Sequence, residues 1–273
     1  MRSFSIGDAT AGGDRLLILS GPCVVESEAM CLAIAERMRD LCAARKLPFV
    51  FKASYRKANR SSGKSFAGLG MDEALAVLAK VKREIGVPVV TDVHEEAEVA
   101  AAAEVADVLQ IPAFLCRQTG LLVAAARTGR AVNVKKGQFL APADMRNAAE
   151  KITGAGNDRV LLTERGTTFG YGDLVVDMRG LVVMRELGWP VLYDATHSLQ
   201  RPGGTTTGGD RRFALPLVRA AVATGLDGLF FETHPDPERA LSDAATQLPL
   251  DQAGAFLDEA CRVRDAVAEV TRG

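Results

Sequence analysis

Short apolar runs alternate with longer amphipathic stretches along the whole chain. The apolar runs, rich in Val, Ile and Leu, cover residues 16–20, 48–54, 87–93, 108–112, 131–134, 160–163, 190–193 and 228–231. The amphipathic stretches cover residues 26–45, 71–84, 95–104, 119–128, 142–153, 174–187, 212–224 and 252–270. Continuous Val/Ile/Leu runs are typical of parallel strands that are buried on both faces. The pattern therefore predicts a repeated β-α unit.

Eight such units in a chain of 273 residues favour an α/β fold of the TIM (β/α)8 barrel type. We expect a single barrel domain over residues 1–273, with the polar residues 1–14 as an N-terminal extension. A doubly wound sheet is the alternative. That fold usually has a glycine-rich turn after its first strand, whereas this chain has Gly21-Pro22-Cys23 there.

Composition narrows the range of partners. Apolar residues make up 48% of the chain, and its net charge is −1. This balance predicts a well-filled core and argues against nucleic acid or an anionic membrane as the main partner. No apolar run is long enough to span a bilayer, and the N-terminus lacks the apolar core of a signal peptide, so we expect a cytoplasmic protein. The five cysteines contain no Cys-x-x-Cys pair, which makes a disulfide framework unexpected.

A basic stretch, residues 51–62, begins at the end of the second predicted strand. It presents Lys52, Lys57 and Arg60 together with Asn59 and several hydroxyl groups. Arginine offers a planar fork to phosphate and lysine a point charge, so the stretch suits an anionic ligand. A solvated basic loop is the alternative, but the position at the end of a buried strand favours binding.

The next residues, Gly63-Lys64-Ser65, end like a phosphate-binding P-loop. That motif needs a glycine five positions before its second glycine, where this chain has Ala58. We therefore reject a nucleotide site here.

Every predicted strand is followed by charged or hydrogen-bonding side chains, and in a barrel these ends converge on the catalytic face. In strand order they are Cys23 with Glu26 and Ser27, Lys52 with Ser54 and Lys57, Asp92 with His94, Gln110 with Arg117, Asn133 with Lys135 and Lys136, Glu164 with Arg165, Asp194 with His197, and Glu232 with His234. The many cations among them suggest ligands that carry more than one phosphate or carboxylate. Convergent polar ends predict a ligand site.

A metal site is predicted at one edge of this face. Cys23, His197 and Glu232 follow the first, seventh and eighth strands, which are neighbours in a closed barrel, and Asp243 lies in the following loop. A mixed set of S, N and O ligands suits Zn²⁺, Fe²⁺, Mn²⁺ or Co²⁺. Taken singly, Cys23 would be a small core residue and His197 a hydrogen-bonded wall residue. His234 is a rival ligand, with a structural role in its turn as the alternative.

The segment 198–212 contains two Gly-Gly pairs and few apolar residues. We expect a mobile lid over the site. The alternative is that this segment is disordered and has no functional role.

Several longer motifs occur at these strand ends. They are Gly21-Pro22-Cys23, Phe51-Lys52-Ala53-Ser54, Lys57-Ala58-Asn59-Arg60-Ser61-Ser62, Thr91-Asp92-Val93-His94, Gln110-Ile111-Pro112-Ala113-Phe114-Leu115, Asn133-Val134-Lys135-Lys136, Arg165-Gly166 with Phe169-Gly170-Tyr171, Asp194-Ala195-Thr196-His197-Ser198, and Glu232-Thr233-His234-Pro235-Asp236-Pro237. Over about residues 17–250 the chain resembles the 3-deoxy-D-manno-octulosonate 8-phosphate synthases.

The resemblance implies a transferase on a TIM barrel, assembled as a homotetramer. Such an enzyme condenses phosphoenolpyruvate with D-arabinose 5-phosphate and water, and releases inorganic phosphate. Its product enters lipopolysaccharide biosynthesis in the cytoplasm of Gram-negative cells. The implied cofactor is a divalent metal ion, Zn, Mn, Fe, Co or Cd, with no organic cofactor.

The resemblance also implies roles for individual residues. Phosphoenolpyruvate would be held by Lys52, Ser54, Lys57, Gln110, Lys135 and Arg165, with Ala113 as a further substrate contact. The pentose phosphate would be held by Asn59, Arg60 and Ser61, with Arg117 contributed by a neighbouring subunit. Lys135, Arg165, His197 and Asp92 would be the catalytic set. The metal ligands would be Cys23, His197, Glu232 and Asp243.

The family has metal-dependent and metal-independent members, and the latter carry Asn in place of Cys23. The cysteine and the run 241–247 therefore favour the metal-dependent type. The chain also departs from the common family pattern at Arg56, at Gly63-Lys64 and at Ala67. These departures bear on the pentose end of the site.

Three alternatives remain at this point. A 3-deoxy-D-arabino-heptulosonate 7-phosphate synthase would use erythrose 4-phosphate, but its loop reads Lys-Pro-Arg-Thr-Ser where this chain has residues 58–62. A non-catalytic sugar-phosphate-binding barrel would bind without turnover. Within the enzyme class, Lys135 could instead act as a covalent Schiff-base lysine.

Overall fold

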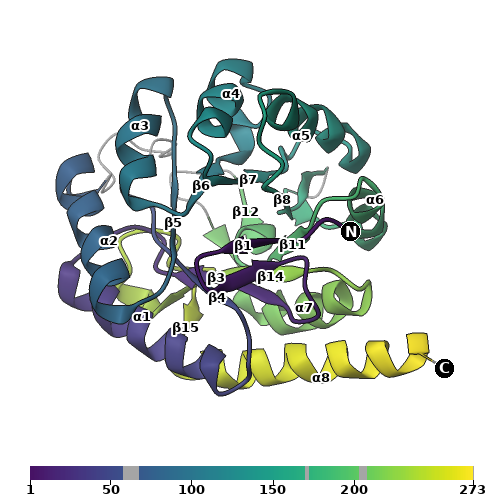
Figure 1. Cartoon of the computed structure of the whole chain (residues 1–273). Coiled ribbons are helices and arrows are strands. Elements are labelled where there is room, and N and C mark those ends of the chain that lie inside the picture. The colour runs from purple at the N-terminus through teal and green to yellow at the C-terminus, as the bar shows by residue number, and fades with distance from the viewer. Residues whose placement is uncertain (58–67, 170–171, 203–207, 273) are drawn as a thin grey trace.

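Eight parallel strands close into a barrel that is surrounded by helices (Figure 1). The computed structural model describes residues 1–57, 68–169, 172–202 and 208–272. The barrel strands follow the order β3-β4-β5-β6-β7-β8-β11-β14, and β14 pairs in parallel with both β11 and β3. The predicted single-domain TIM barrel is confirmed.

The elements agree with the hydrophobic pattern to within a few residues. The barrel strands are β3 (Leu17–Gly21), β4 (Phe49–Lys52), β5 (Val89–Asp92), β6 (Val108–Ile111), β7 (Ala131–Lys135), β8 (Val160–Glu164), β11 (Val191–Asp194) and β14 (Gly228–His234). The α-helices are α1 (Glu28–Ala43), α2 (Met71–Ile85), α3 (Glu96–Val105), α4 (Thr119–Arg127), α5 (Met145–Gly154), α6 (Met178–Glu186), α7 (Ala214–Ala223) and α8 (Ala253–Arg272).

Helix α6 begins later than the predicted start at residue 174. The Asp177 side chain accepts a hydrogen bond from the Arg179 N–H and caps the helix there. The two residues β10 (Leu174–Val175) pair instead with β9 (Thr167–Thr168) in a small antiparallel sheet. Apolar periodicity runs through both elements, so it could not separate them.

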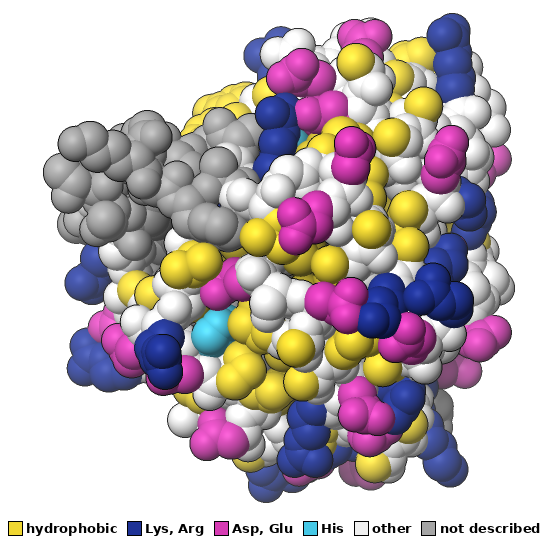
Figure 2. Space-filling view, turned by 90° about the vertical axis from the view of Figure 1, so that its left-hand side faces the viewer, with side chains coloured by type: hydrophobic (Ala, Val, Ile, Leu, Met, Phe, Trp, Pro, Cys, Tyr) yellow, Lys and Arg dark blue, Asp and Glu magenta, His cyan; other side chains and the backbone are white. Residues whose placement is uncertain are grey.

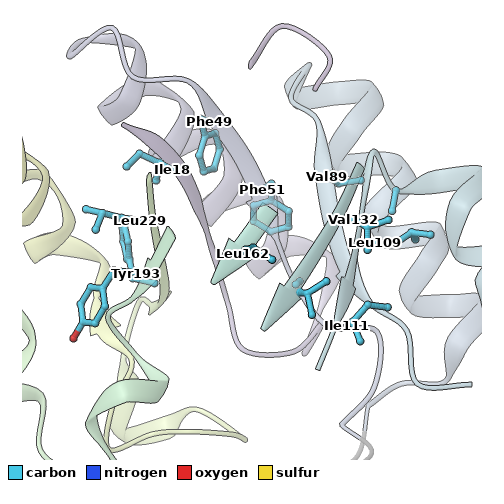
Figure 3. Close-up of a cluster of buried hydrophobic side chains, with 14 of the residues drawn as sticks. Ile18, Phe49, Phe51, Val89, Leu109, Ile111, Val132, Leu162, Tyr193 and Leu229 are labelled. Atoms are coloured by element: carbon cyan, nitrogen blue, oxygen red, sulfur yellow. The ribbon is translucent and has the colours of Figure 1, made fainter. Parts of the chain in front are cut away.

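The main core lies between the barrel wall and the helices. Outward-facing strand residues such as Phe51, Val89, Leu109 and Leu162 are fully buried there (Figure 3). Alternate strand residues point to opposite faces, so the remaining residues of the same strands point into the barrel. A strand that is buried on both faces explains the unbroken apolar runs in the sequence.

A second core fills the N-terminal end of the barrel. It is formed by inward-facing Leu17, Leu19, Val50, Val90, Val108, Ala131, Leu161, Leu192 and Phe230. The hairpin of β1 (Phe4–Ile6) and β2 (Ala9–Ala11) covers this end, and its Ile6, Ala9 and Ala11 are buried against the same cluster (Figure 1). These residues close the floor of the barrel.

The strands pack closely around Gly228 at this end of the barrel, which leads to a testable prediction. A Cβ atom there would lie 2.5 Å from the backbone oxygen of Leu17 and 3.1 Å from the Cγ of Leu192. Because the first neighbour is backbone, the strands must shift, and Gly228→Ala is expected to destabilise the fold by about 2–3 kcal/mol. Thermal unfolding should show a Tm lower by roughly 5–10 °C.

Gly154→Ala is the matched control, because a Cβ atom at Gly154 meets nothing within 4 Å. Its Tm should be unchanged or slightly raised, since alanine favours helix more than glycine does. Equal Tm values for the two variants would contradict the close packing described for β14.

Acidic and basic side chains are interspersed over the face that Figure 2 presents, in keeping with the net charge of −1. Within the described part of the chain, no helix combines the length and apolar character needed to cross a membrane.

Candidate active site

Inward-facing side chains change from apolar to polar along each strand. On β14, Phe230 of the inner core is followed two residues later by Glu232, and on β4, Val50 is followed by Lys52. All of these residues are buried. Since residues two apart share a face, the period of the strand places the polar groups above the apolar floor, at the C-terminal mouth.

A chain of hydrogen bonds crosses five neighbouring strands in this polar layer. The Ser54 hydroxyl and the Gln110 Nε2 donate to the Asp92 carboxylate at 2.7 and 2.6 Å. Asn133 Nδ2 donates to Gln110 Oε1 at 2.9 Å, and the Thr163 hydroxyl donates to Asn133 Oδ1 at 2.7 Å. The predicted residues Ser54, Asp92 and Gln110 are thus brought together. Thr163 was not among the residues expected from the sequence, although on β8 it follows the inward-facing Leu161 by two residues and therefore points inward.

The charge of Asp92 sets the donor and acceptor direction of every hydrogen bond in this row. A carboxylate only accepts, so Gln110 must turn its NH₂ group toward it, and this orients Asn133 in turn. Burial alone would raise the pKa of Asp92, but Lys52, Lys57 and His94 together with the Ser54 hydrogen bond hold that pKa below its usual value. The carboxylate therefore stays charged at neutral pH.

Lys135 is buried beside an acid. Its Nζ lies 2.5 Å from Asp194 Oδ2 and 3.0 Å from the centroid of the Phe230 ring. Burial lowers the pKa of Lys135 to about 8, although Asp194 opposes this shift by favouring the charged form. Lys135 is thus a cation near neutral pH that sits close to its titration point.

Arg165 is a second buried cation. Its Nη2 donates to Gln200 Oε1 at 2.8 Å, and Gln200 Nε2 donates to Asp243 Oδ1 at 3.0 Å. Its Nη1 is buried and has no hydrogen-bond partner among the described residues. Burial lowers the pKa of the guanidinium, though neighbouring acids such as Asp194 and Asp243 oppose this. A buried, unpaired guanidinium nitrogen suits an anionic ligand.

Cys23, Glu232 and Asp243 form a compact acidic group. One possible ligand atom from each lies within 4.8 Å of the others. The Cys23 thiol lies 3.0 Å from Asp243 Oδ2 and 2.9 Å from the Ser242 hydroxyl. Burial, with Asp243 and Glu232 nearby, raises the pKa of the Cys23 thiol well above its usual value. The group is one that a divalent cation would stabilise.

His197 faces the same group. Its Nδ1 is 2.8 Å from Asp194 Oδ2, so the carboxylate fixes Nδ1 as the donor and leaves the lone pair on Nε2. That Nε2 lies 3.6 Å from Glu232 Oε1 and 3.8 Å from Asp243 Oδ2. A carboxylate that orients a histidine toward a group of acids is the usual arrangement behind a metal-ligating imidazole.

Glu232 is shared between this group and two lysines. Lys52 Nζ is 2.5 Å and Lys57 Nζ 3.8 Å from Oε1, while Oε2 is buried without a hydrogen-bond partner among the described residues. Burial alone would raise the pKa of Glu232, but Lys52, His197 and Lys57 hold it far below its usual value. The unpaired Oε2 of a charged carboxylate is free to act as a ligand, so the residues present fit a divalent cation.

A sequence profile of the DAHP synthetase I family matches residues 4–269, nearly the whole chain. The chain belongs to this family. Three curated relatives of this family member share one name, 2-dehydro-3-deoxyphosphooctonate aldolase. The relative from Syntrophotalea carbinolica is 54% identical, with 98% of this chain and 97% of its own length covered. The relative from Trichlorobacter lovleyi is 56% identical, with 94% and 95% covered. The relative from Acidithiobacillus ferrooxidans is 58% identical, with 85% and 84% covered.

The shared name is another name for 3-deoxy-D-manno-octulosonate 8-phosphate synthase, so the resemblance seen in the sequence is confirmed. Asn59, Arg60 and Ser61 lie outside the described residues of this DAHP synthetase I family member, as do the departures at Gly63-Lys64 and Ala67. Residues 203–207 of the expected lid are outside as well, and its flanks β12 (Gln200–Arg201) and β13 (Gly208–Gly209) pair with each other.

Four further residues that the sequence singled out lie in the described part of the chain. Ala113 is buried in a 3₁₀ turn after β6, and Arg117 is exposed just beyond it. Arg56, one of the departures from the family pattern, forms ion pairs with Glu95 and Glu98. His234 is not part of the group formed by Cys23, Glu232 and Asp243, and its Nδ1 accepts a hydrogen bond from the Asp236 N–H.

Proposed function

We propose that this enzyme condenses phosphoenolpyruvate with D-arabinose 5-phosphate and water to give 3-deoxy-D-manno-octulosonate 8-phosphate and inorganic phosphate. The name of the curated relatives supports this reaction. The main structural support for this reaction is the set of buried cations above the barrel floor, Lys52, Lys135 and Arg165. Buried cations of this number suit a ligand that brings both a carboxylate and a phosphate.

Phosphoenolpyruvate is assigned to the inward-facing layer of the mouth. Lys135 and the unpaired Nη1 of Arg165 would offset its negative charge, together with Lys52 and Lys57 beside Glu232. These groups are already fixed by Asp194 and Gln200, so little reorganisation is needed when charge develops. The amide of Gln110, oriented by the Asp92 charge, presents its remaining N–H as a further donor.

A divalent cation is assigned to Cys23, His197, Glu232 and Asp243. The fit described above supports this assignment: a thiol, two carboxylates and an imidazole nitrogen that is held in place by Asp194. When bound, such an ion supplies Lewis-acid chemistry, either polarising the sugar aldehyde or orienting the attacking water. No organic cofactor is required for the reaction.

The bonds of the proposed reaction balance without a covalent enzyme intermediate. C3 of phosphoenolpyruvate forms a bond to the aldehyde carbon of the pentose, and water adds at C2. The resulting hemiketal phosphate then loses inorganic phosphate. Asp92 lines the pocket as a charged acceptor, while Lys135 and Arg165 offset charge on the carboxylate and phosphate.

The remaining assignments concern the localisation, the oligomeric state, the pentose phosphate contacts and the use of the product. We propose a cytoplasmic homotetramer in which Arg117, exposed beyond β6, reaches the pentose phosphate of a neighbouring subunit. Asn59, Arg60 and Ser61 would hold that phosphate from the loop after β4. The product would serve lipopolysaccharide biosynthesis.

Phosphate release from phosphoenolpyruvate tests the reaction and its cofactor together. We expect release with arabinose 5-phosphate and not with erythrose 4-phosphate. We also expect EDTA to abolish release and Mn²⁺ or Zn²⁺ to restore it. Release that survives thorough chelation would contradict the proposed metal role but would still support the synthase reaction. Release with erythrose 4-phosphate alone would indicate the heptulosonate enzyme, and none with either sugar would favour a binding protein.

A further inference from the structure

Glu26 lies in the loop between β3 and α1 and makes two contacts with distant segments. Its Oε1 accepts a hydrogen bond from the Leu241 N–H at 3.0 Å. Its Oε2 lies 3.7 Å from Nε2 of His234, and the Glu26 side chain is only 11% exposed. Neither contact is explained by the substrate or metal assignments above.

The contact with His234 is directional. His234 Nδ1 accepts the Asp236 N–H at 3.0 Å, so the neutral ring carries its proton on Nε2. This Nε2 is buried without a hydrogen-bond partner among the described residues, and it faces the Glu26 carboxylate. A distance of 3.7 Å is longer than a hydrogen bond, so the attraction is electrostatic.

The three segments that meet at Glu26 are those that carry the compact acidic group. Glu26 follows Cys23 by three residues, His234 follows Glu232 by two, and Leu241 precedes Asp243 by two. Glu26 therefore links the stretch that carries Cys23 to the two distant stretches that carry Glu232 and Asp243. Each link is made close to one of the three possible ligands, but none of them uses a ligand atom.

Asp243 is the member of the group that most needs such support. Its φ of 49° lies in the left-handed region, which for a residue other than glycine costs on the order of 1 kcal/mol. Its backbone oxygen accepts hydrogen bonds from the N–H groups of Thr246 and Gln247, which hold the loop on its C-terminal side. Glu26 holds the N-terminal side through Leu241.

We propose that Glu26 is a positioning residue for the divalent cation, holding Cys23, Glu232 and Asp243 at the separation that one ion can bridge. The inference rests on the cation site proposed above. Glu26 is not a member of the acidic group itself, so it acts through the three segments and not as a ligand.

Cobalt binding to the full-length protein tests this role without relying on turnover. A Cys23 thiolate bound to Co²⁺ gives a charge-transfer absorption band, whose titration yields the affinity. Loss of a residue that orients metal ligands typically weakens binding by about 10- to 100-fold, and we expect that loss for Glu26→Ala. Glu26→Gln keeps an oxygen for the Leu241 N–H but loses the charge that faces His234, so its affinity should be intermediate.

Glu36→Ala is the matched control, because Glu36 is an exposed residue of α1 whose ion pair with Arg39 spans 3.6 Å. It should bind Co²⁺ as the unmodified protein does. Unchanged Co²⁺ affinity in Glu26→Ala and Glu26→Gln, even with a lower Tm of the metal-free protein, would overturn the inference and leave Glu26 a structural residue. If Glu26→Ala does not fold, the Co²⁺ affinity of Glu26→Gln alone tests the inference: weaker binding supports it and unchanged binding overturns it. Absence of the band in the unmodified protein would overturn the cation site, and with it this inference.

Discussion

Replacing Cys23 by serine is expected to weaken divalent-cation binding and phosphate release by at least about 100-fold. Changes to residues that only orient the ligands of a metal already weaken its binding by about 100-fold, whereas this change removes a proposed ligand itself. Serine has nearly the same shape, so the packing against Ser242 and Asp243 is retained. An oxygen in place of sulfur also shifts the preference of the site toward harder ions such as Mn²⁺. Metal content after dialysis and phosphate release at limiting metal measure both effects.

Cys261→Ser provides the comparison, since Cys261 is a half-buried thiol on α8. It should retain metal and activity. A Cys23→Ser protein that keeps full activity and full metal content would show that the thiol is a core residue and not a ligand. Restored activity in excess Mn²⁺ would agree with the proposed site.

Lys135→Met is expected to lower kcat by about 10²–10³-fold, the usual effect of removing one preorganised charge from a dry site. Methionine fills a similar volume without the cation, so the buried Asp194 loses the ammonium group that lies beside it. Steady-state kinetics with both substrates would measure the loss. A kcat within a factor of three of the unmodified enzyme would contradict a direct role for Lys135.

The pH profile separates the charge of Lys135 from its shape. Its pKa is lowered to about 8 by burial, so the side chain loses its proton as pH rises through that value. If the cation is needed, kcat/KM for phosphoenolpyruvate should fall about tenfold per pH unit on the alkaline side. Lys135→Arg keeps its charge throughout this range and should lack that decline, even at lower activity.

The same lowered pKa would also suit a Schiff-base lysine, which has to be partly neutral to attack a carbonyl. The carboxylate of Asp194 at 2.5 Å favours the charged form and therefore opposes that role. Treatment with borohydride in the presence of arabinose 5-phosphate, the substrate whose aldehyde could form an imine, should leave the activity intact. A stable adduct on Lys135 would move the mechanism to the covalent class.

The sequence predicts the barrel well because each strand is buried on both faces. The runs at 87–93 and 108–112, for example, appear as β5 and β6 with ends shifted by no more than two residues. The closeness of Cys23 and Glu232 also follows from the sequence, since closure makes the first and last strands neighbours. The hydrophobic periodicity is therefore enough to predict the barrel fold and the catalytic face at the C-terminal ends of its strands.

Other features depend on register and on loop conformation, which periodicity does not encode. Thr163 joins the hydrogen-bonded chain because of its position opposite Asn133, and Gln200 reaches Arg165 and Asp243 from a loop. The hairpin of β1 and β2 was predicted only as a polar extension, because three-residue strands are too short to show a period. Such contacts become visible only when the strands are placed side by side.

The closed floor of the barrel has a consequence for the order of events in catalysis. Because the hairpin residues Ile6, Ala9 and Ala11 close the N-terminal end, the described part of the chain leaves the C-terminal mouth as the way into the barrel interior. Under the proposed assignment, phosphoenolpyruvate occupies the inner layer and the pentose phosphate lies outside it. A pocket that is closed at one end admits its inner occupant first, so this assignment predicts that phosphoenolpyruvate binds before the sugar.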